Sequence, residues 1–142
     1  MSKSGIDRLR SLAEQFRAAI VRCPKEMLPV ALQRFPRGAC GTSCDLLGQY
    51  LIDSEHSSVE YICGHRGIQS HAWLLVEGLI IDITANQFQE IGSEIIIKKG
   101  SRFHKSFIED FRRQGGIWRD EQYSQATLES TYQEIRSRII DC

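Results

Sequence analysis

Apolar residues near the N-terminus recur at intervals of three and four positions. The series consists of Ile6, Leu9, Leu12, Phe16 and Ile20. This spacing gives one apolar stripe on a helix, and Pro24 beyond its end is a typical stop signal. We therefore predict an amphipathic N-terminal helix. A second short helix through Met27 and Leu32 and a loop over Phe35–Gly38 are predicted to follow it.

The middle of the chain carries one more helical pattern and then a series of strands. From Gly41 onward, apolar residues three or four positions apart predict a buried helix. They are Cys44, Leu47 and Leu51. Alternating or continuous apolar runs then predict strands over Val59–Gly64, His71–Val76, Leu79–Thr84 and Glu94–Lys98. His65–Gln69 is predicted to be a loop, and the Glu77-Gly78 pair predicts the tight turn of an antiparallel hairpin.

Two helices are predicted in the last third of the chain. Three phenylalanines at four-residue spacing, Phe103, Phe107 and Phe111, predict a helix that stops at Gly115-Gly116. A final helix is predicted from Leu128, Tyr132, Ile135 and Ile139. Together the patterns predict one α+β domain over residues 1–142. Helices come first, an antiparallel sheet occupies the middle, and helices come last.

Composition and charge exclude several classes of protein. Hydrophobic residues make up 42% of the 142 residues and charged residues 25%, which is typical of a globular chain. Eighteen basic side chains balance eighteen acidic ones, so no general attraction to nucleic acid or to an anionic membrane is expected. The longest apolar run, Ala72–Val76, is far shorter than the ~20 residues that a bilayer span needs. Without a secretory signal after Met1, a cytoplasmic location is expected.

The cysteines raise the question of chemistry. There are five, an odd number, in a chain expected to reside in a reducing compartment, so a disulfide framework is not predicted. A zinc site is conceivable from Cys40, Cys44, Cys63, His65 and His71. However, the Cys-x-x-x-Cys pair is followed by Cys-x-His rather than by a second clean pair, and we expect no metal. No glycine-rich phosphate loop with its lysine is present, so no nucleotide or other cofactor is expected.

Each strand of the predicted hairpin contains one ionisable residue among apolar ones. If Val76 and Leu79 flank a two-residue turn, Trp73 faces Asp82. If the turn is shifted, His71 faces Asp82 directly. In both registers His71 and Asp82 lie on one face of the sheet, because strand side chains alternate. A buried carboxylate needs a partner, and an imidazole on the neighbouring strand would be oriented by it and favoured as imidazolium.

The segment Gly38–Gly41 surrounds Cys40 with small residues, at the point where the buried helix is predicted to begin. A helix N-terminus and a nearby imidazolium both stabilise a thiolate, which is the reactive form of cysteine. Cys44 lies one turn further on beside leucines, where a small buried hydrophobic residue is expected. His104, before the phenylalanine-rich segment, is expected at the surface or as a capping residue. Trp118 is expected to serve packing.

These residues resemble the core of the papain-like and transglutaminase-like cysteine superfamily. The matching elements are Gly38-Ala39-Cys40, Cys44, Leu46-Leu47, His71-Ala72-Trp73 and Ile81-Asp82-Ile83-Thr84. The resemblance covers about Phe35 to Phe88, and the size resembles compact bacterial papain-fold peptidases and toxin or effector deamidases. It implies a nucleophile helix packed on a small antiparallel sheet, with Cys40 as nucleophile, His71 as base and then acid, and Asp82 orienting the imidazole.

The resemblance also suggests residues that contact the substrate. A papain-type glutamine upstream of the nucleophile contributes to the oxyanion hole, and Gln33 is the candidate here. The backbone N–H of Cys40 is a second donor on mechanistic grounds. Trp73 is expected in the core or as a wall of the cleft. Specificity would come from loops over Asp53–Ser58, His65–Ser70 and Asn86–Gly92.

Two functions follow from these expectations. The first is a cysteine hydrolase or acyltransferase that acts on a protein or peptide through a covalent acyl-enzyme. Peptidase (thiol protease), glutamine deamidase and transglutaminase chemistry share that first half. The alternative is a non-catalytic binding or immunity-type protein that retains the fold. The complete set of Cys40, His71 and Asp82 favours the enzyme, since a binding protein has no need to retain all three.

Overall fold

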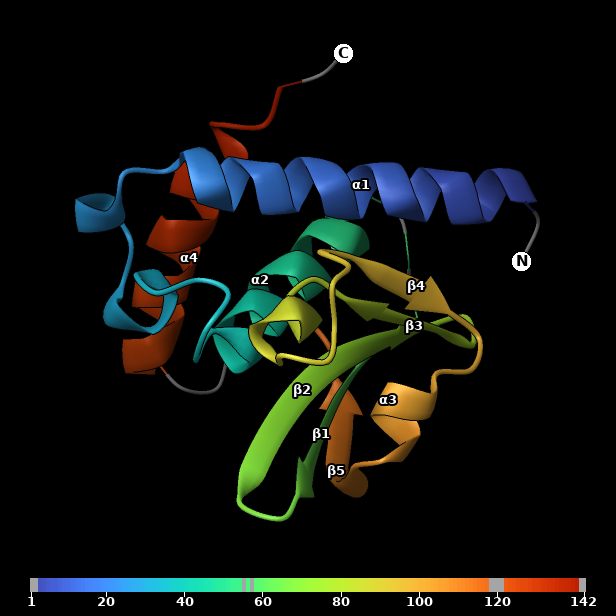
Figure 1. The fold of residues 1–142 in the computed structure, drawn as a ribbon. Helices are drawn as coiled ribbons and strands as arrows, with labels where there is room; N and C mark the ends of the chain where they lie inside the picture. The colour runs from blue at the N-terminus through green and yellow to red at the C-terminus, as the bar shows by residue number, and fades with distance from the viewer. Residues whose placement is uncertain (1–2, 55, 57, 118–121, 141–142) are drawn as a thin grey trace.

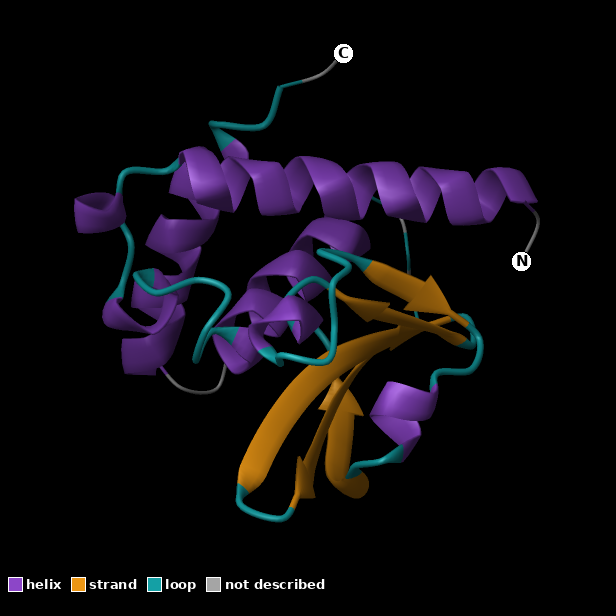
Figure 2. Ribbon diagram, viewed as in Figure 1, coloured by secondary structure: helices purple, strands orange, loops and turns teal. Residues whose placement is uncertain are grey.

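The computed structural model describes residues 3–54, 56, 58–117 and 122–140. Trp118 and Cys142 therefore lie outside the described residues, as do Glu55 and Ser57 of the first predicted specificity loop. Figure 1 traces the chain, and Figure 2 shows that its long helices gather on one side of the strands. Among the described residues, no helix combines the length and the apolar character that crossing a bilayer requires.

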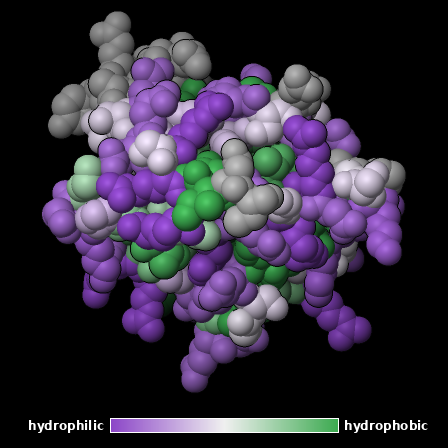
Figure 3. Space-filling view, turned by 90° about the horizontal axis from the view of Figure 1, so that it is seen from above, coloured by the Kyte–Doolittle hydropathy of each residue, from purple (hydrophilic) through white to green (hydrophobic). Residues whose placement is uncertain are grey.

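The first helix, α1 (Lys3–Arg22), confirms the prediction from the N-terminal stripe. Its inward side buries Leu9, Phe16 and Ile20. Figure 3 views the molecule from the side on which α1 lies, and that face is mainly hydrophilic with only small apolar patches. The predicted second helix is instead two short 3₁₀ turns, Lys25–Met27 and Val30–Leu32. Proline precedes each turn and lacks the N–H that a continuous helix would require.

The central helix α2 (Cys40–Asp53) begins one residue before the predicted start. It is buried on several sides, because it packs against α1 and against two strands of the sheet. Gly48 allows the backbone at Gly115-Gly116 to lie close to α2. A Cβ at this position would lie 2.9 Å from the backbone nitrogen of Gly116, so any larger residue would force the two segments apart.

The sheet has five strands, and every neighbouring pair is antiparallel. The strands are β1 (Val59–Arg66), β2 (Gln69–Val76), β3 (Leu79–Asp82), β4 (Ile96–Lys98) and β5 (Ile108–Gln114). Their order is β4-β3-β2-β1-β5. The β2–β3 hairpin turns at Glu77 and Gly78, which both have positive φ, as the sequence predicted. The predicted loop His65–Gln69 is wrong, because β1 and β2 continue to Arg66 and Gln69 and leave a shorter turn.

The predicted helix over the three phenylalanines is also wrong. Only one turn of helix forms, α3 (Arg102–Lys105), and the chain then enters β5. Phe103 and Phe107 pack on one face of the sheet, whereas Phe111 is paired with Cys63 in β1 and stacks on Tyr61 on the other face. Strand pairing with β1 therefore overrode a spacing that matched a helix. The last helix, α4 (Gln122–Arg136), confirms the prediction and ends before Ile139.

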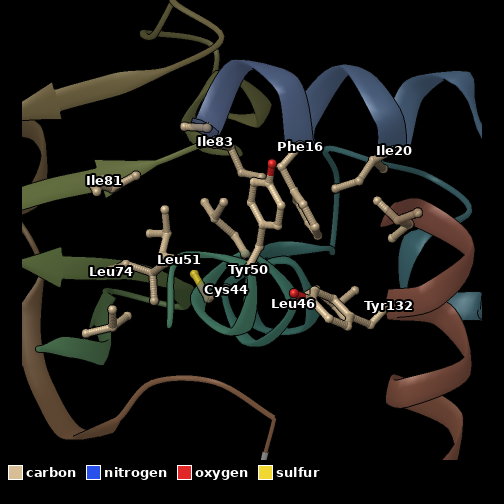
Figure 4. Packing of buried hydrophobic residues seen from close by; sticks show 14 of the residues in the cluster. Phe16, Ile20, Cys44, Leu46, Tyr50, Leu51, Leu74, Ile81, Ile83 and Tyr132 are labelled. Carbon is tan, nitrogen blue, oxygen red and sulfur yellow. The ribbon is translucent and has the colours of Figure 1, made fainter. Parts of the chain in front are cut away.

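The two faces of the sheet carry different cores. The main core lies between the sheet and the helices. Figure 4 shows Leu51 on the side of α2 toward Leu74 and Ile81, Leu46 toward Tyr132, and Phe16 beside Tyr50. The opposite face carries a smaller, aromatic cluster under α3. It contains Ile62, Trp73 and Phe107, with Leu75, Ile80, Phe88 and Phe103 against them. The protein is thus an α+β fold whose antiparallel sheet has a helical layer on one face and a single helical turn on the other.

Candidate active site

Cys40 is the first residue of α2. The helix starts with the Ser43 N–H bonded to the carbonyl oxygen of Ala39, so the N–H groups in between have no partner within the helix. The Cys40 side chain is half-buried. Backbone N–H groups of Gly41, in the same turn, and of Ala72, in β2, donate hydrogen bonds to its sulfur. The helix start thus directs donors at the thiol, as expected for a site that stabilises a thiolate.

His71 and Asp82 meet across the β2–β3 hairpin. Val76 pairs with Leu79, which is the first of the two predicted registers and places Asp82 diagonally to His71. His71 Nε2 lies 2.6 Å from Asp82 Oδ2. The two residues are 0% and 2% exposed, so their charges are shielded from solvent. The expected histidine–carboxylate pair is therefore present and buried.

Cys40 and His71 influence each other electrostatically, since each side chain is among the causes of the other's pKa shift. Nε2 of His71 is occupied by Asp82, so Nδ1 is the ring nitrogen left for other partners. Burial alone would raise the pKa of Cys40, but the hydrogen bond and charge of His71 and the two backbone donors bring it below its ordinary value. Burial alone would lower the pKa of His71, but Asp82 and Cys40 raise it to about 9. Both shifts favour a thiolate–imidazolium pair near neutral pH.

Asp82 receives donors at both carboxylate oxygens. Oδ1 accepts the backbone N–H of Thr84 at 2.9 Å, and the Thr84 hydroxyl lies 3.4 Å away. Oδ2 accepts from His71 and also from His104, whose Nε2 is 2.7 Å away. Burial would raise the pKa of Asp82, but the hydrogen bonds from His104 and His71 hold it well below its ordinary value. The carboxylate is therefore ionised, and four donor groups surround its two oxygens.

Sequence reasoning missed two residues at this site. His104 was expected at the surface or in a cap. It is 3% exposed, and it meets Asp82 because the one-turn helix α3 folds over the outer face of the sheet. Gln87 was not singled out. Its Nε2 lies 3.5 Å from His71 Nδ1, and its Oε1 accepts from the Gly38 N–H at 3.4 Å. His104 is 22 residues beyond Asp82, so no local pattern indicated their contact.

The two residues expected to contact substrate lie elsewhere. Gln33 is exposed, and its amide donates to the carbonyl oxygen of Leu28 at 3.0 Å. None of the contacts described for Cys40 involves Gln33. Trp73 is 5% exposed and packs edge-to-face against His104, at 4.9 Å between ring centroids. It supports the ring layer around His71 from within the aromatic cluster.

Cys44 lies one turn after Cys40 and points into the main core (Figure 4). Burial raises the pKa of its thiol well above the ordinary value, and nearby negative charge from Asp82 adds to this effect. The prediction of a small buried hydrophobic residue is confirmed. Cys63, in β1, is half-exposed, and the pKa of its thiol is also raised by burial.

The structure offers one grouping with the composition of a metal site. Among the described residues, His71, Asp82 and His104 are the group whose ligand atoms lie close enough together to share an ion. The atoms from the two rings lie 2.6 and 2.7 Å from the same carboxylate oxygen. Ligands ~2.1 Å from one ion are separated by more than ~3 Å in tetrahedral geometry. The distances between the ring nitrogens and Asp82 Oδ2 are therefore those of hydrogen bonds and not those between ligands of one ion.

An open cavity adjoins the site through Gln87. Its volume is about 440 Å³, and Gln69 and the segment 87–90 line it. These residues come from two of the three loops that were predicted to set specificity. The lining is rich in side-chain amides, which both donate and accept hydrogen bonds.

Comparisons of the chain with protein-family models, with curated proteins and with solved structures found no match in any of the three. A function is therefore inferred from the residues and their geometry.

Proposed function

We propose that this protein is a cysteine enzyme of amide or acyl chemistry, with Cys40 as nucleophile, His71 as general base and acid, and Asp82 as the residue that orients the imidazole. The observation that carries the proposal is the buried His71–Asp82 pair, with 2.6 Å between Nε2 and Oδ2, beside the start of α2. The lowered pKa of the Cys40 thiol and the raised pKa of the His71 imidazole, each with the other side chain among its causes, add to it. The helix-then-sheet arrangement and the order of the three residues along the chain also support a papain-like or transglutaminase-like core.

The first half of the reaction forms a thioester. The Cys40 thiolate attacks a carbonyl carbon, and the donors we expect for the developing oxyanion are the backbone N–H of Cys40 and Nε2 of Gln87. His71 then gives its Nδ1 proton to the leaving nitrogen as the carbon–nitrogen bond breaks. In the second half, His71 takes a proton from water, whose oxygen attacks the thioester carbon and releases the thiolate.

The leaving and accepting groups decide which reaction results. Loss of an amine from a peptide bond is proteolysis, and loss of ammonia from a glutamine side chain is deamidation. Attack by an amine in place of water is transamidation. The amide-lined cavity beside Gln87 suits the backbone of an extended peptide, which supports a protein or peptide substrate.

Acylation by 4-nitrophenyl acetate tests the proposal without knowledge of the natural substrate. The thiolate attacks the ester carbonyl, 4-nitrophenolate leaves, and an acetyl group remains on Cys40. We expect a burst of 4-nitrophenolate and an acetylated Cys40 peptide in mass spectra. Cys40→Ala should reduce the rate by about 10³-fold or more and still fold. His71→Ala should reduce it strongly as well.

Cys44→Ala is the matched control, because it removes a thiol from the next turn of the same helix and should retain the burst. A burst that survives in Cys40→Ala, or acetylation of another cysteine in the unmutated protein, would contradict the proposal. In that case the binding or immunity-type function would become the better one.

A further inference from the structure

His104 makes a contact that the proposed chemistry does not yet use. Its ring is buried in α3, and its Nε2 shares Asp82 Oδ2 with His71 Nε2. The two imidazoles thus converge on one oxygen atom from two different elements. An ionised carboxylate only accepts hydrogen bonds, so Nε2 of each ring must carry a proton.

The other nitrogen of His104 is held as well. Its Nδ1 lies 2.6 Å from Ser101 Oγ, and the same oxygen accepts the backbone N–H of His104 at 3.3 Å. Ser101 is therefore the N-cap of α3 and a partner of the ring. With both ring nitrogens bonded and Trp73 packed edge-on against it, the His104 ring has one orientation, in which Nε2 points at Asp82.

We propose that His104 is a positioning residue that acts through Asp82, fixing the carboxylate so that His71 keeps its Nε2 proton and presents Nδ1 to Cys40. This inference rests on the proposed function. Without the donor from His104, Asp82 Oδ2 loses one of two hydrogen bonds and the carboxylate can turn about its bond to Cβ. A neutral His71 would then also populate the tautomer with the proton on Nδ1, which cannot accept the proton of Cys40.

Two substitutions at one position separate the donor from the ring. His104→Phe keeps an aromatic ring and removes the N–H donor, whereas His104→Gln keeps an amide N–H at a similar reach. We expect His104→Phe to acylate with 4-nitrophenyl acetate about tenfold more slowly, the size of one charge-assisted hydrogen bond. His104→Gln should regain most of that loss. Phe103→Leu is the matched packing control, since it loosens the same helical turn without removing a donor to Asp82.

Ring-nitrogen NMR provides a readout that a purely structural role would not change. In a Cys40→Ala background, above the pH at which His71 loses its proton, we expect His71 to carry the remaining proton on Nε2. His104→Phe should give a mixture of the two tautomers, and Phe103→Leu should not. In the unmutated chain, His104 should carry a proton on Nε2, which can be measured even if His104→Phe fails to fold.

The outcomes distinguish this inference from the proposed function. An unmutated rate and tautomer in His104→Phe, or an Nε2 without a proton on His104, would overturn the role of His104 alone. A Cys40 that is not acylated in the unmutated protein would overturn the proposed function and this inference with it.

Discussion

Cys40 and Cys44 lie on successive turns of α2, yet their surroundings give the two thiols opposite properties. At Cys40, His71 and the backbone N–H groups of Ala72 and Gly41 lower the pKa of the thiol against the effect of burial. Cys44 lies among aliphatic side chains between α2 and the sheet, and burial raises the pKa of its thiol well above the ordinary value. The first is poised to be a thiolate, whereas the second is held as a thiol.

The position along the helix, and not the residue type, therefore sets the pKa of each thiol. At its first residue a helix offers free N–H groups and an approach for another element, here the part of β2 that β3 does not pair with. One turn later those N–H groups are bonded and the side chain meets the core.

Asp82→Asn should cause the largest change in the stability of the fold. His71 and His104 would both lose a buried ionised acceptor, and Cys40 would lose the support for its imidazolium partner. Removing one partner from a buried pair typically costs about 3 kcal/mol or more in free energy of unfolding, which urea denaturation measures. The matched control is Asp110→Asn in the exposed His65–Asp110 pair, where less than about 1 kcal/mol is expected. Equal losses at the two positions would contradict the account.

The pH dependence of stability should reveal the charge state of the Cys40–His71 pair. The pKa of His71 is raised from 6.5 to about 9, so its contribution is complete below pH 6.5 and is lost as the pH rises through 9. The pKa of Cys40 is lowered from 9.0, so its contribution is present above pH 9 and is lost as the pH falls through the lowered value. In the range above pH 6.5 and above the lowered pKa of Cys40, and below pH 9, the folded pair gains one proton and loses one, so the two effects on stability cancel.

Cys40→Ala removes the contribution of the thiol to the pH dependence of stability and leaves the contribution of His71. Stability of the variant should then fall with rising pH just above pH 7, by up to about 1.4 kcal/mol per pH unit, while the unmutated protein stays nearly level. Urea denaturation at a series of pH values measures both slopes. Parallel slopes for the two proteins would indicate that the native pair is a neutral thiol and imidazole.

Cys44→Ala should have the smallest effect. Removing the sulfur leaves a small cavity in the main core, and a loss of about 1 kcal/mol in the free energy of unfolding is expected. The alkylation rate of Cys40 should not change. A large drop in that rate would mean that Cys44, rather than the helix start, contributes to the reactivity of Cys40.

The sequence predicted the parts of the site that local patterns encode. Helical and alternating periodicities located α1, α2 and the β2–β3 hairpin, and the alternation of strand side chains placed His71 and Asp82 on one face. Two hairpin registers remained open from the sequence, and the structure has the one in which Val76 pairs with Leu79. The start of a buried helix indicated the environment of Cys40 to within one residue.

The parts that it missed depend on long-range packing. Three phenylalanines at helical spacing predicted a helix, but pairing of β5 with β1 converted most of that segment into a strand and left one turn that carries His104. His104 and Gln87 reach the site across 22 and 16 residues from their partners Asp82 and His71. Only the folded sheet brings these side chains together, because no periodicity links them.

Alkylation by iodoacetamide across about pH 4 to 9 shows whether Cys40 is an activated thiolate. The reaction is followed for each cysteine peptide by mass spectrometry. Cys63 is the comparator, because it is half-exposed like Cys40 while the pKa of its thiol is raised. We expect fast labelling of Cys40 near pH 6, slow labelling of Cys63 and Cys44, and loss of the fast phase in His71→Ala. Labelling of Cys40 that is no faster than that of Cys63 at any pH would contradict this expectation.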